Sequence, residues 1–180
     1  MKKFILLVLT TICLTFSSFA QTPCITFLGI PIDGTKREMI SKLDAKGYEY
    51  NSYNDCLVGE FNGVDVIIFI ETVNNRVWRI AVVDKSFTDE ANIKIRFNIL
   101  FEQFSNNSKY AILDGNMLNE NDDISYEMQV HNKRYDAAFI PTDISINGLV
   151  WYTIDAVPPH GYRIVIFYEN SNNAADGSEL

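Results

Sequence analysis

Three apolar segments joined by tight turns follow one another between residues 56 and 84. Residues 56–61 and 64–72 flank the Asn-Gly pair at 62–63, which strongly favours a two-residue hairpin turn. The Asn-Asn pair at 74–75 then leads into the third apolar segment, residues 76–84. The pattern predicts an antiparallel meander of three strands, whose register the two turns would fix.

Alternate residues of a strand point to opposite faces, so this register predicts two different sheet faces. One face would carry Gly59 and Ala81 near its centre, where small side chains let a helix pack closely. The other would have an apolar centre with Trp78 at one end. The residues we take as a candidate partner-binding surface on this second face are Val58, Ile67, Phe69, Trp78, Ile80 and Val82.

The apolar second face needs cover, either from later strands or loops of the same chain or from a partner protein. Aromatic side chains surrounded by polar ones are typical of the centre of a protein interface. The sequence alone leaves both alternatives open.

Two helices are predicted, each placed before a run of strands. Within the opening stretch 25–48, a strand and a turn precede a short helix with Thr35 at its N-cap and Glu38 three residues later, the pattern of a capping box. A longer helix would start at an N-cap at Thr88. Its apolar residues recur at helical spacing, and they are Ile93, Phe97, Leu100, Phe101 and Phe104.

The second half of the chain contains four further strand-like segments, at residues 124–131, 134–140, 149–156 and 163–169. Adjacent strands joined by tight turns indicate antiparallel pairing, so the predicted fold class is α+β, a curved antiparallel meander sheet with helices packed on one face. The helix-plus-strands order would occur twice in a single domain.

The predicted domain covers residues 21–170, with halves at about 25–84 and 88–170. Residues 171–180 lack apolar side chains until the last position and are predicted to form a disordered tail.

The first twenty residues have the features of a secretory signal peptide. Two lysines precede an apolar run at residues 4–14, and small residues lead to a cleavage site after Ala20. The run is too short to span a bilayer, so the mature chain is expected to be periplasmic or secreted, without membrane insertion.

The charge of the mature chain excludes two classes of partner. Loss of Lys2 and Lys3 would leave 13 basic against 23 acidic residues, a net charge of −10. An acidic protein is a poor ligand for nucleic acids and anionic membranes. Cys24 and Cys56 would remain, and in an oxidising compartment they could form one disulfide or stay as two buried thiols.

The sequence offers little for catalysis, and we expect no enzyme activity, cofactor or metal site. His131 and His160 are far apart in the sequence, and no known catalytic or nucleotide-binding motif is present. Glu60, Asp65 and Asp84 would stand side by side on the predicted meander, where crowding can raise a carboxyl pKa, although solvated edge charges are the more common outcome. The alternative function is a small hydrolase or ligand carrier with a pocket between sheet and helix, using Glu60, Asp65 or His160.

Several segments resemble a known group of bacterial envelope proteins. They are Phe27-Leu28-Gly29-Ile30-Pro31, Asp33-Gly34-Thr35, the helix end Lys42-Leu43 to Lys46-Gly47-Tyr48, and Leu57-Val58-Gly59-Glu60-Phe61-Asn62-Gly63. In these features the chain resembles β-lactamase-inhibitor-protein-like domains and the small lipoproteins of outer-membrane assembly. The resemblance implies a helix-then-meander fold and a sheet face presented to another protein. It does not imply β-lactamase inhibition, because the paired cysteines of that inhibitor's repeats are missing.

The expected function is therefore a secreted or periplasmic, non-enzymatic module that binds a protein partner through one face of its sheet.

Overall fold

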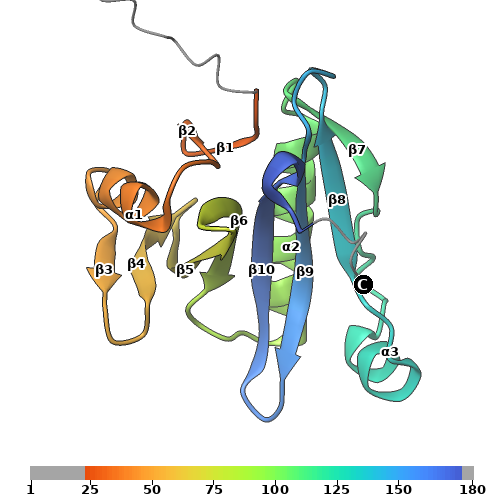
Figure 1. Ribbon diagram of the computed structural model, residues 1–180. Helices are drawn as coiled ribbons and strands as arrows, with labels where there is room; N and C mark the ends of the chain where they lie inside the picture. The colour runs from red at the N-terminus through yellow and green to blue at the C-terminus, as the bar shows by residue number, and fades with distance from the viewer. Residues whose placement is uncertain (1–22, 176–180) are drawn as a thin grey trace, which may run out of the picture.

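The computed structural model describes residues 23–175, and the predicted signal peptide lies outside this range. The fold is α+β, as predicted, with an eight-stranded antiparallel sheet and a separate two-stranded hairpin (Figure 1). The strands are β1 (Thr26–Phe27), β2 (Ile30–Pro31), β3 (Glu49–Asn51), β4 (Cys56–Phe61), β5 (Val64–Val73), β6 (Arg76–Asp84), β7 (Tyr110–Asp114), β8 (Asp136–Pro141), β9 (Gly148–Val157) and β10 (Gly161–Asn170). The helices are α1 (Lys36–Asp44), α2 (Glu90–Ser105), α3 (Ile124–His131) and a short 3₁₀ turn, η1 (Ser171–Asn173).

The large sheet consists of two meanders joined through their last strands. Its strand order is β3-β4-β5-β6-β10-β9-β8-β7. The junction is the antiparallel pair β6–β10, which runs from Val83↔Val165 to Arg79↔Glu169. The expected repetition of a helix followed by strands is confirmed, with α1 before the first meander and α2 before the second.

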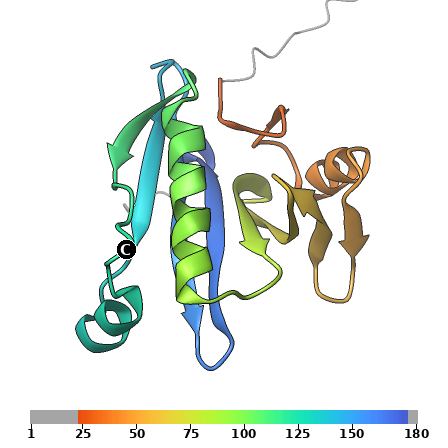
Figure 2. The same cartoon turned by 180° about the vertical axis from the view of Figure 1, so that it is seen from behind.

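One face of the sheet holds the hydrophobic core and is covered by α2, which lies behind β9 and β10 in Figure 1 and in front of them in Figure 2. Phe97 of α2 is fully buried, and its ring centroid lies 4.8 Å from that of Tyr152 on β9. The Tyr152 hydroxyl donates to the Phe97 carbonyl oxygen at 3.0 Å, and burial raises the pKa of this phenol. We call this side of the sheet the helix face.

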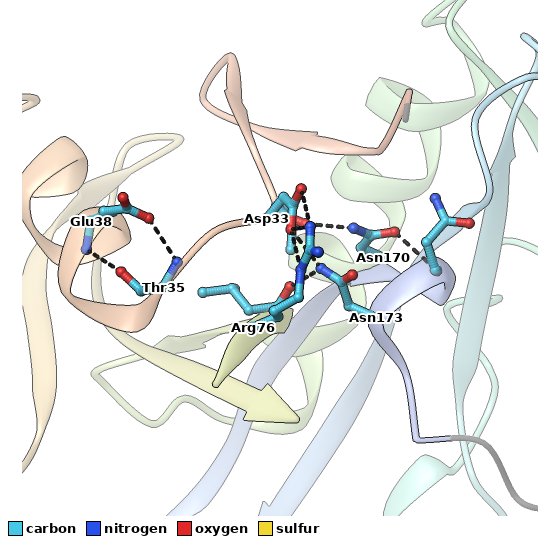
Figure 3. Close-up of polar contacts among 9 residues, drawn as sticks. Asp33, Thr35, Glu38, Arg76, Asn170 and Asn173 are labelled. Atoms are coloured by element: carbon cyan, nitrogen blue, oxygen red, sulfur yellow. Dashed lines mark hydrogen bonds and ion pairs between the residues drawn. The ribbon is translucent and has the colours of Figure 1, made fainter. Parts of the chain in front are cut away.

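The start of α1 is set by the predicted capping box, which is confirmed (Figure 3). The Thr35 hydroxyl accepts from the Glu38 N–H at 3.3 Å, and the Glu38 carboxylate accepts from the Thr35 N–H at 2.8 Å. Two otherwise unpaired amides at the helix start are thereby satisfied. The helix buries Met39 and Leu43 completely, so its apolar side belongs to the same core.

The capping box predicts that part of the folding stability is lost in acid. The N–H and hydroxyl of Thr35 hold the pKa of Glu38 below its usual value. A lowered folded-state pKa contributes stability that is complete above the ordinary carboxyl pKa of about 4.3 and is lost as the pH falls through the folded-state value. Glu38→Gln should therefore lower the midpoint of urea unfolding at pH 7. In acid, the midpoints of the variant and of the unmodified protein should converge. An equal difference at both pH values would contradict this explanation.

The N-terminal hairpin is tied to the C-terminal end of the described chain by a polar network (Figure 3). Arg76 donates two hydrogen bonds from its Nη2 to Asp33, at 2.6 and 2.8 Å. Asn173 donates to Asp33 at 2.9 Å and to the Val77 carbonyl at 2.8 Å, and Asn170 donates to the Ile32 carbonyl at 2.7 Å. Residues 171–173 are thus ordered by these contacts, contrary to the predicted disordered tail, while residues 176–180 lie outside the described range.

Two segments differ in type from the prediction. Residues 124–131 form α3 instead of a strand, because the Asp123 side chain accepts from the Tyr126 N–H at 2.9 Å and Asn132 ends the helix in the left-handed conformation, with φ of 52°. The place of this strand in the second meander is taken by β7, which was not predicted. The short strand β3 forms where no strand was predicted, and the N-cap of α2 is Asp89 instead of Thr88.

Candidate functional site

A β-bulge in β6 changes the register on which the candidate surface was predicted. Both predicted two-residue turns are present, but the pairing of β5 with β6 shifts between Glu71 and Thr72. Glu71 lies opposite Arg79 and Thr72 opposite Val77, so Trp78 is the extra residue of the bulge. Every residue of β6 beyond the bulge therefore faces the side opposite to the one predicted.

The bulge corrects two of the six predicted surface residues. Ile80 and Val82 point to the helix face and are buried there, at 0% and 1% exposure, opposite Ile70 and Ile68. Ala81, which we expected under a helix, points instead to the face that carries Trp78.

The remaining four predicted residues do share one face, and strands of the second meander extend it. Phe69 pairs with Ala81, Ala81 with Phe167, and Phe167 with Trp151, so these side chains lie in one row across four strands. We name this surface the tryptophan face, and its central residues are Val58, Ile67, Phe69, Trp78, Ala81, Trp151 and Phe167.

Aromatic rings and a guanidinium form a continuous stack across the tryptophan face. The guanidinium carbon of Arg79 lies 3.9 Å from the Trp78 ring centroid and 5.1 Å from that of Phe167. Phe167 and Trp151 then stack with centroids 4.2 Å apart and ring planes 20° from parallel. Arg134 lies at the far end, 6.0 Å from the Trp151 ring. Each cation–π contact contributes about 0.5–2 kcal/mol, depending on how well it is shielded from water.

Carboxylates of the same face hold this stack in place. Arg79 lies 2.9 Å from Glu169 and 3.3 Å from Glu71. Glu169 also accepts a hydrogen bond from the Trp151 indole N–H at 2.8 Å. A single carboxylate thus fixes both the guanidinium and one of the two indoles, so the row of side chains is ordered before any partner arrives.

The tryptophan face lies on the side of the sheet away from α2. In Figures 1 and 2, α2 lies only on the opposite side of β9 and β10. Phe69 is 38% exposed, and Ile67, Trp78, Phe167 and Trp151 are half-buried. An apolar surface that spreads over several strands and stays partly exposed to solvent is unusual for a monomeric protein.

The three carboxylates expected to stand side by side are separated by the same register shift. Glu60 and Asp65 pair directly and point to the tryptophan face, where both are exposed. Asp84 points to the helix face, is 6% exposed, and forms an ion pair with Arg96 of α2 at 3.2 Å. The predicted crowding of three carboxylates therefore does not occur.

The cysteines and histidines are placed apart from one another. Cys24 and Cys56 are both buried, and both are free thiols in the structure. Burial, with a smaller effect of Asp33, raises the pKa of Cys24 and keeps this thiol protonated. His131 contacts Glu127 on α3, whereas His160 lies in the β9–β10 turn beside Phe87.

The described part of the chain contains no cluster of three or more potential metal ligands. Within the same residues, no helix combines the length and the apolar composition needed to cross a bilayer.

A pocket of about 380 Å³ lies on the helix face, between the β4–β5 hairpin and the end of α2. Its walls are formed by Leu28, Tyr48, Glu60, Phe61, Asn62, Leu100, Gln103, Phe104 and Asn107. Tyr48 is buried there and donates to the Glu60 carbonyl at 2.8 Å, and burial followed by the nearby Glu60 charge raises its pKa. The Glu60 carboxylate itself alternates with Gly59 and points to the tryptophan face, so it does not supply acid–base chemistry to the pocket.

Three residues of the stack were not predicted as part of the candidate site, and they are Arg79, Trp151 and Phe167. Trp151 and Tyr152 are neighbours on β9 and point to opposite faces, and Tyr152 is the one buried in the core. The pairing of β6 with β10 carries the missing information, because it joins residues about ninety positions apart. No local pattern encodes such a contact.

Comparison of the chain with protein-family models, with curated proteins and with solved structures gave no match. The functional conclusion therefore depends on the geometry of the site itself.

Proposed function

We propose that this chain is a non-enzymatic binding module that docks a partner protein on the tryptophan face. The observation that carries the proposal is the ordered stack of Trp78, Arg79, Phe167 and Trp151 on the sheet surface away from α2. Tryptophan and arginine are the residues most enriched where binding energy concentrates in protein interfaces.

The order of the stack favours binding, because side chains fixed in advance lose little conformational entropy in a complex. Immobilising one flexible side chain at an interface costs about 0.5–1.5 kcal/mol. Arg79 and Trp151 are already held by Glu169, so most of this cost is met during folding.

The proposed site of action is the periplasm or the cell exterior. The supporting observation is the N-terminal pattern of lysines, a short apolar run and small residues before Gln21. The resemblance to envelope domains that present a sheet face to another protein is consistent with the same function.

Site-specific photo-crosslinking tests the proposal. A benzophenone amino acid at position 69 should give one dominant protein adduct when the full chain is produced in its native host, because Phe69 is the most exposed aromatic of the tryptophan face. The matched control is position 95, since Ile95 is 58% exposed on the outer side of α2. Trp78→Ala should remove the adduct at position 69 and leave the melting temperature within a few degrees.

The proposal fails if positions 69 and 95 give the same adducts, or if position 69 gives none. It also fails if Trp78→Ala leaves the adduct at position 69 unchanged.

A second candidate function is a ligand carrier that uses the pocket beside Tyr48. The pocket volume is within the usual range for small-molecule sites, and aromatic rings and carboxamides form its walls. Asn62 and Gln103 hydrogen-bond to each other across it at 2.7 Å. A carrier needs no protein partner, so it predicts no adduct at position 69.

A further inference from the structure

We infer that the partner meets the tryptophan face with a basic surface, in which lysine or arginine side chains flank an apolar centre. The inference rests on the proposed function and adds the chemistry of the partner. It follows from which charges of the tryptophan face are already neutralised and which are not.

The guanidiniums that the structure places on the tryptophan face are each paired with a carboxylate of the same face. The nitrogen–oxygen distances are 2.9 Å for Arg79–Glu169, 3.3 Å for Arg79–Glu71, 2.8 Å for Arg163–Asp155 and 3.3 Å for Arg134–Asp136. A negatively charged partner would have to break these pairs or leave its own charges without a counterion, and both are costly in a desolvated interface.

Four carboxylates of the face have no such pairing: Asp114 on β7, and three on the first meander. Glu60 and Asp65 lie opposite each other on β4 and β5, and Glu49 lies opposite Val58 on β3, which places all three on the tryptophan face. All three are exposed, and none forms an ion pair among residues 23–175. Lys85 follows β6 and donates its backbone N–H to the Asp65 carbonyl at 2.9 Å, but its ammonium makes no ion pair in the same range.

The unpaired carboxylates adjoin the apolar centre of the face. Glu60 is two residues from Val58 on its strand, and Asp65 is two residues from Ile67, so each carboxylate is next to an apolar side chain on the same surface. A partner that packs on the apolar centre also meets this negative edge, so it needs positive charges there. Complementary charges also raise the rate of association.

The same distribution of charge argues against a second copy of this chain as the partner. The tryptophan face carries eight carboxylates against the three paired arginines, and they are Glu49, Glu60, Asp65, Glu71, Asp114, Asp136, Asp155 and Glu169. Two such faces brought together would oppose like charges within the screening length, about 8 Å at physiological salt. Nucleic acids and anionic lipids are disfavoured for the same reason.

The experiment uses an array of short synthetic peptides of random sequence, in which basic and acidic residues are equally frequent. The full mature chain should retain peptides enriched in both aromatic and basic residues. Neutralising the three unpaired carboxylates of the first meander in the variant Glu49→Gln/Glu60→Gln/Asp65→Asn should abolish the basic enrichment and preserve the aromatic one. For the best peptide, this variant should weaken binding by roughly fivefold to tenfold at low salt, as expected for exposed ion pairs.

A matched variant separates local charge from the charge of the whole chain. Asp44→Asn/Glu102→Gln/Glu120→Gln removes the same number of exposed carboxylates at positions outside the tryptophan face, and it should leave peptide affinity unchanged. Affinity can be followed by intrinsic fluorescence, because both tryptophans of the chain, Trp78 and Trp151, lie on the tryptophan face.

The outcomes separate the two proposals. Aromatic enrichment without basic enrichment overturns the basic partner and leaves the docking face intact. Equal weakening by both triple variants also overturns the basic partner, since it would be an effect of total charge. If Phe69→Ser leaves peptide binding unchanged, the docking face itself is overturned. If the protein forms a concentration-dependent dimer that Phe69→Ser dissociates, the partner is a second copy of the chain.

Discussion

Replacement of Phe97 by alanine is expected to lower the free energy of unfolding by about 3–5 kcal/mol. The Phe97 side chain is fully buried between α2 and the sheet, and its ring contacts Tyr152 edge to face. The substitution removes the apolar contacts of the ring and leaves a cavity that close-packed neighbours fill only in part. Urea unfolding followed by circular dichroism measures the change.

The control for this prediction lies two residues further along the same helix. Ile99 is 44% exposed, so Ile99→Ala should change the free energy of unfolding by about 0.5 kcal/mol or less. Similar losses for the two substitutions would show that α2 does not pack through its Phe97 side.

Gly161→Ala is expected to cost about 2–4 kcal/mol, the second-largest effect. Gly161 has φ of +107° at the start of β10, and a Cβ atom there would overlap the carbonyl oxygen of Thr88. That segment is held against the strand by reciprocal backbone hydrogen bonds between Thr88 and Tyr162, at 2.8 and 2.9 Å. The clash is between two hydrogen-bonded backbone segments, which have little freedom to move apart.

A second glycine isolates the contribution of the clash. Gly47 has a similar φ of +93°, but a Cβ atom there would meet nothing within 4 Å. Gly47→Ala should therefore show only the strain of a left-handed alanine, about 1–2 kcal/mol. Equal unfolding free energies for the two variants would mean that Thr88 can move away from β10.

Local rules predicted the parts of the fold that depend on neighbouring residues. The Asn-Gly hairpin and the Thr35 capping box involve contacts within four residues, and the structure contains both. The helix from 90 to 105 follows from apolar spacing alone, whereas residues 124–131 are too short for their spacing to separate a helix from a strand.

The candidate site was predicted only in part, because one extra residue in β6, Trp78, changes which side chains share its face. Asn74 and Asn75 make the expected two-residue turn, with φ of 49° and 62°, yet Trp78 bulges four residues after Asn74. The bulge places Trp78 and Arg79 together on one surface, where Arg79 stacks on the indole and contacts Glu169. The stabilising partner comes from β10, so sequence near Trp78 could not reveal the shift of Ile80 and Val82 into the core.

The junction between β6 and β10 determines the order in which the chain can become stable. Ile80 and Val82 on one side of it, and Ile166 and Tyr168 on the other, belong to the same core. Pairing residues so distant in sequence is slow, because a large loop must close first. A nascent chain therefore keeps an unpaired central edge until β10 is complete, and any truncation before β10 would leave the long edges of β6 and β9 open to aggregation.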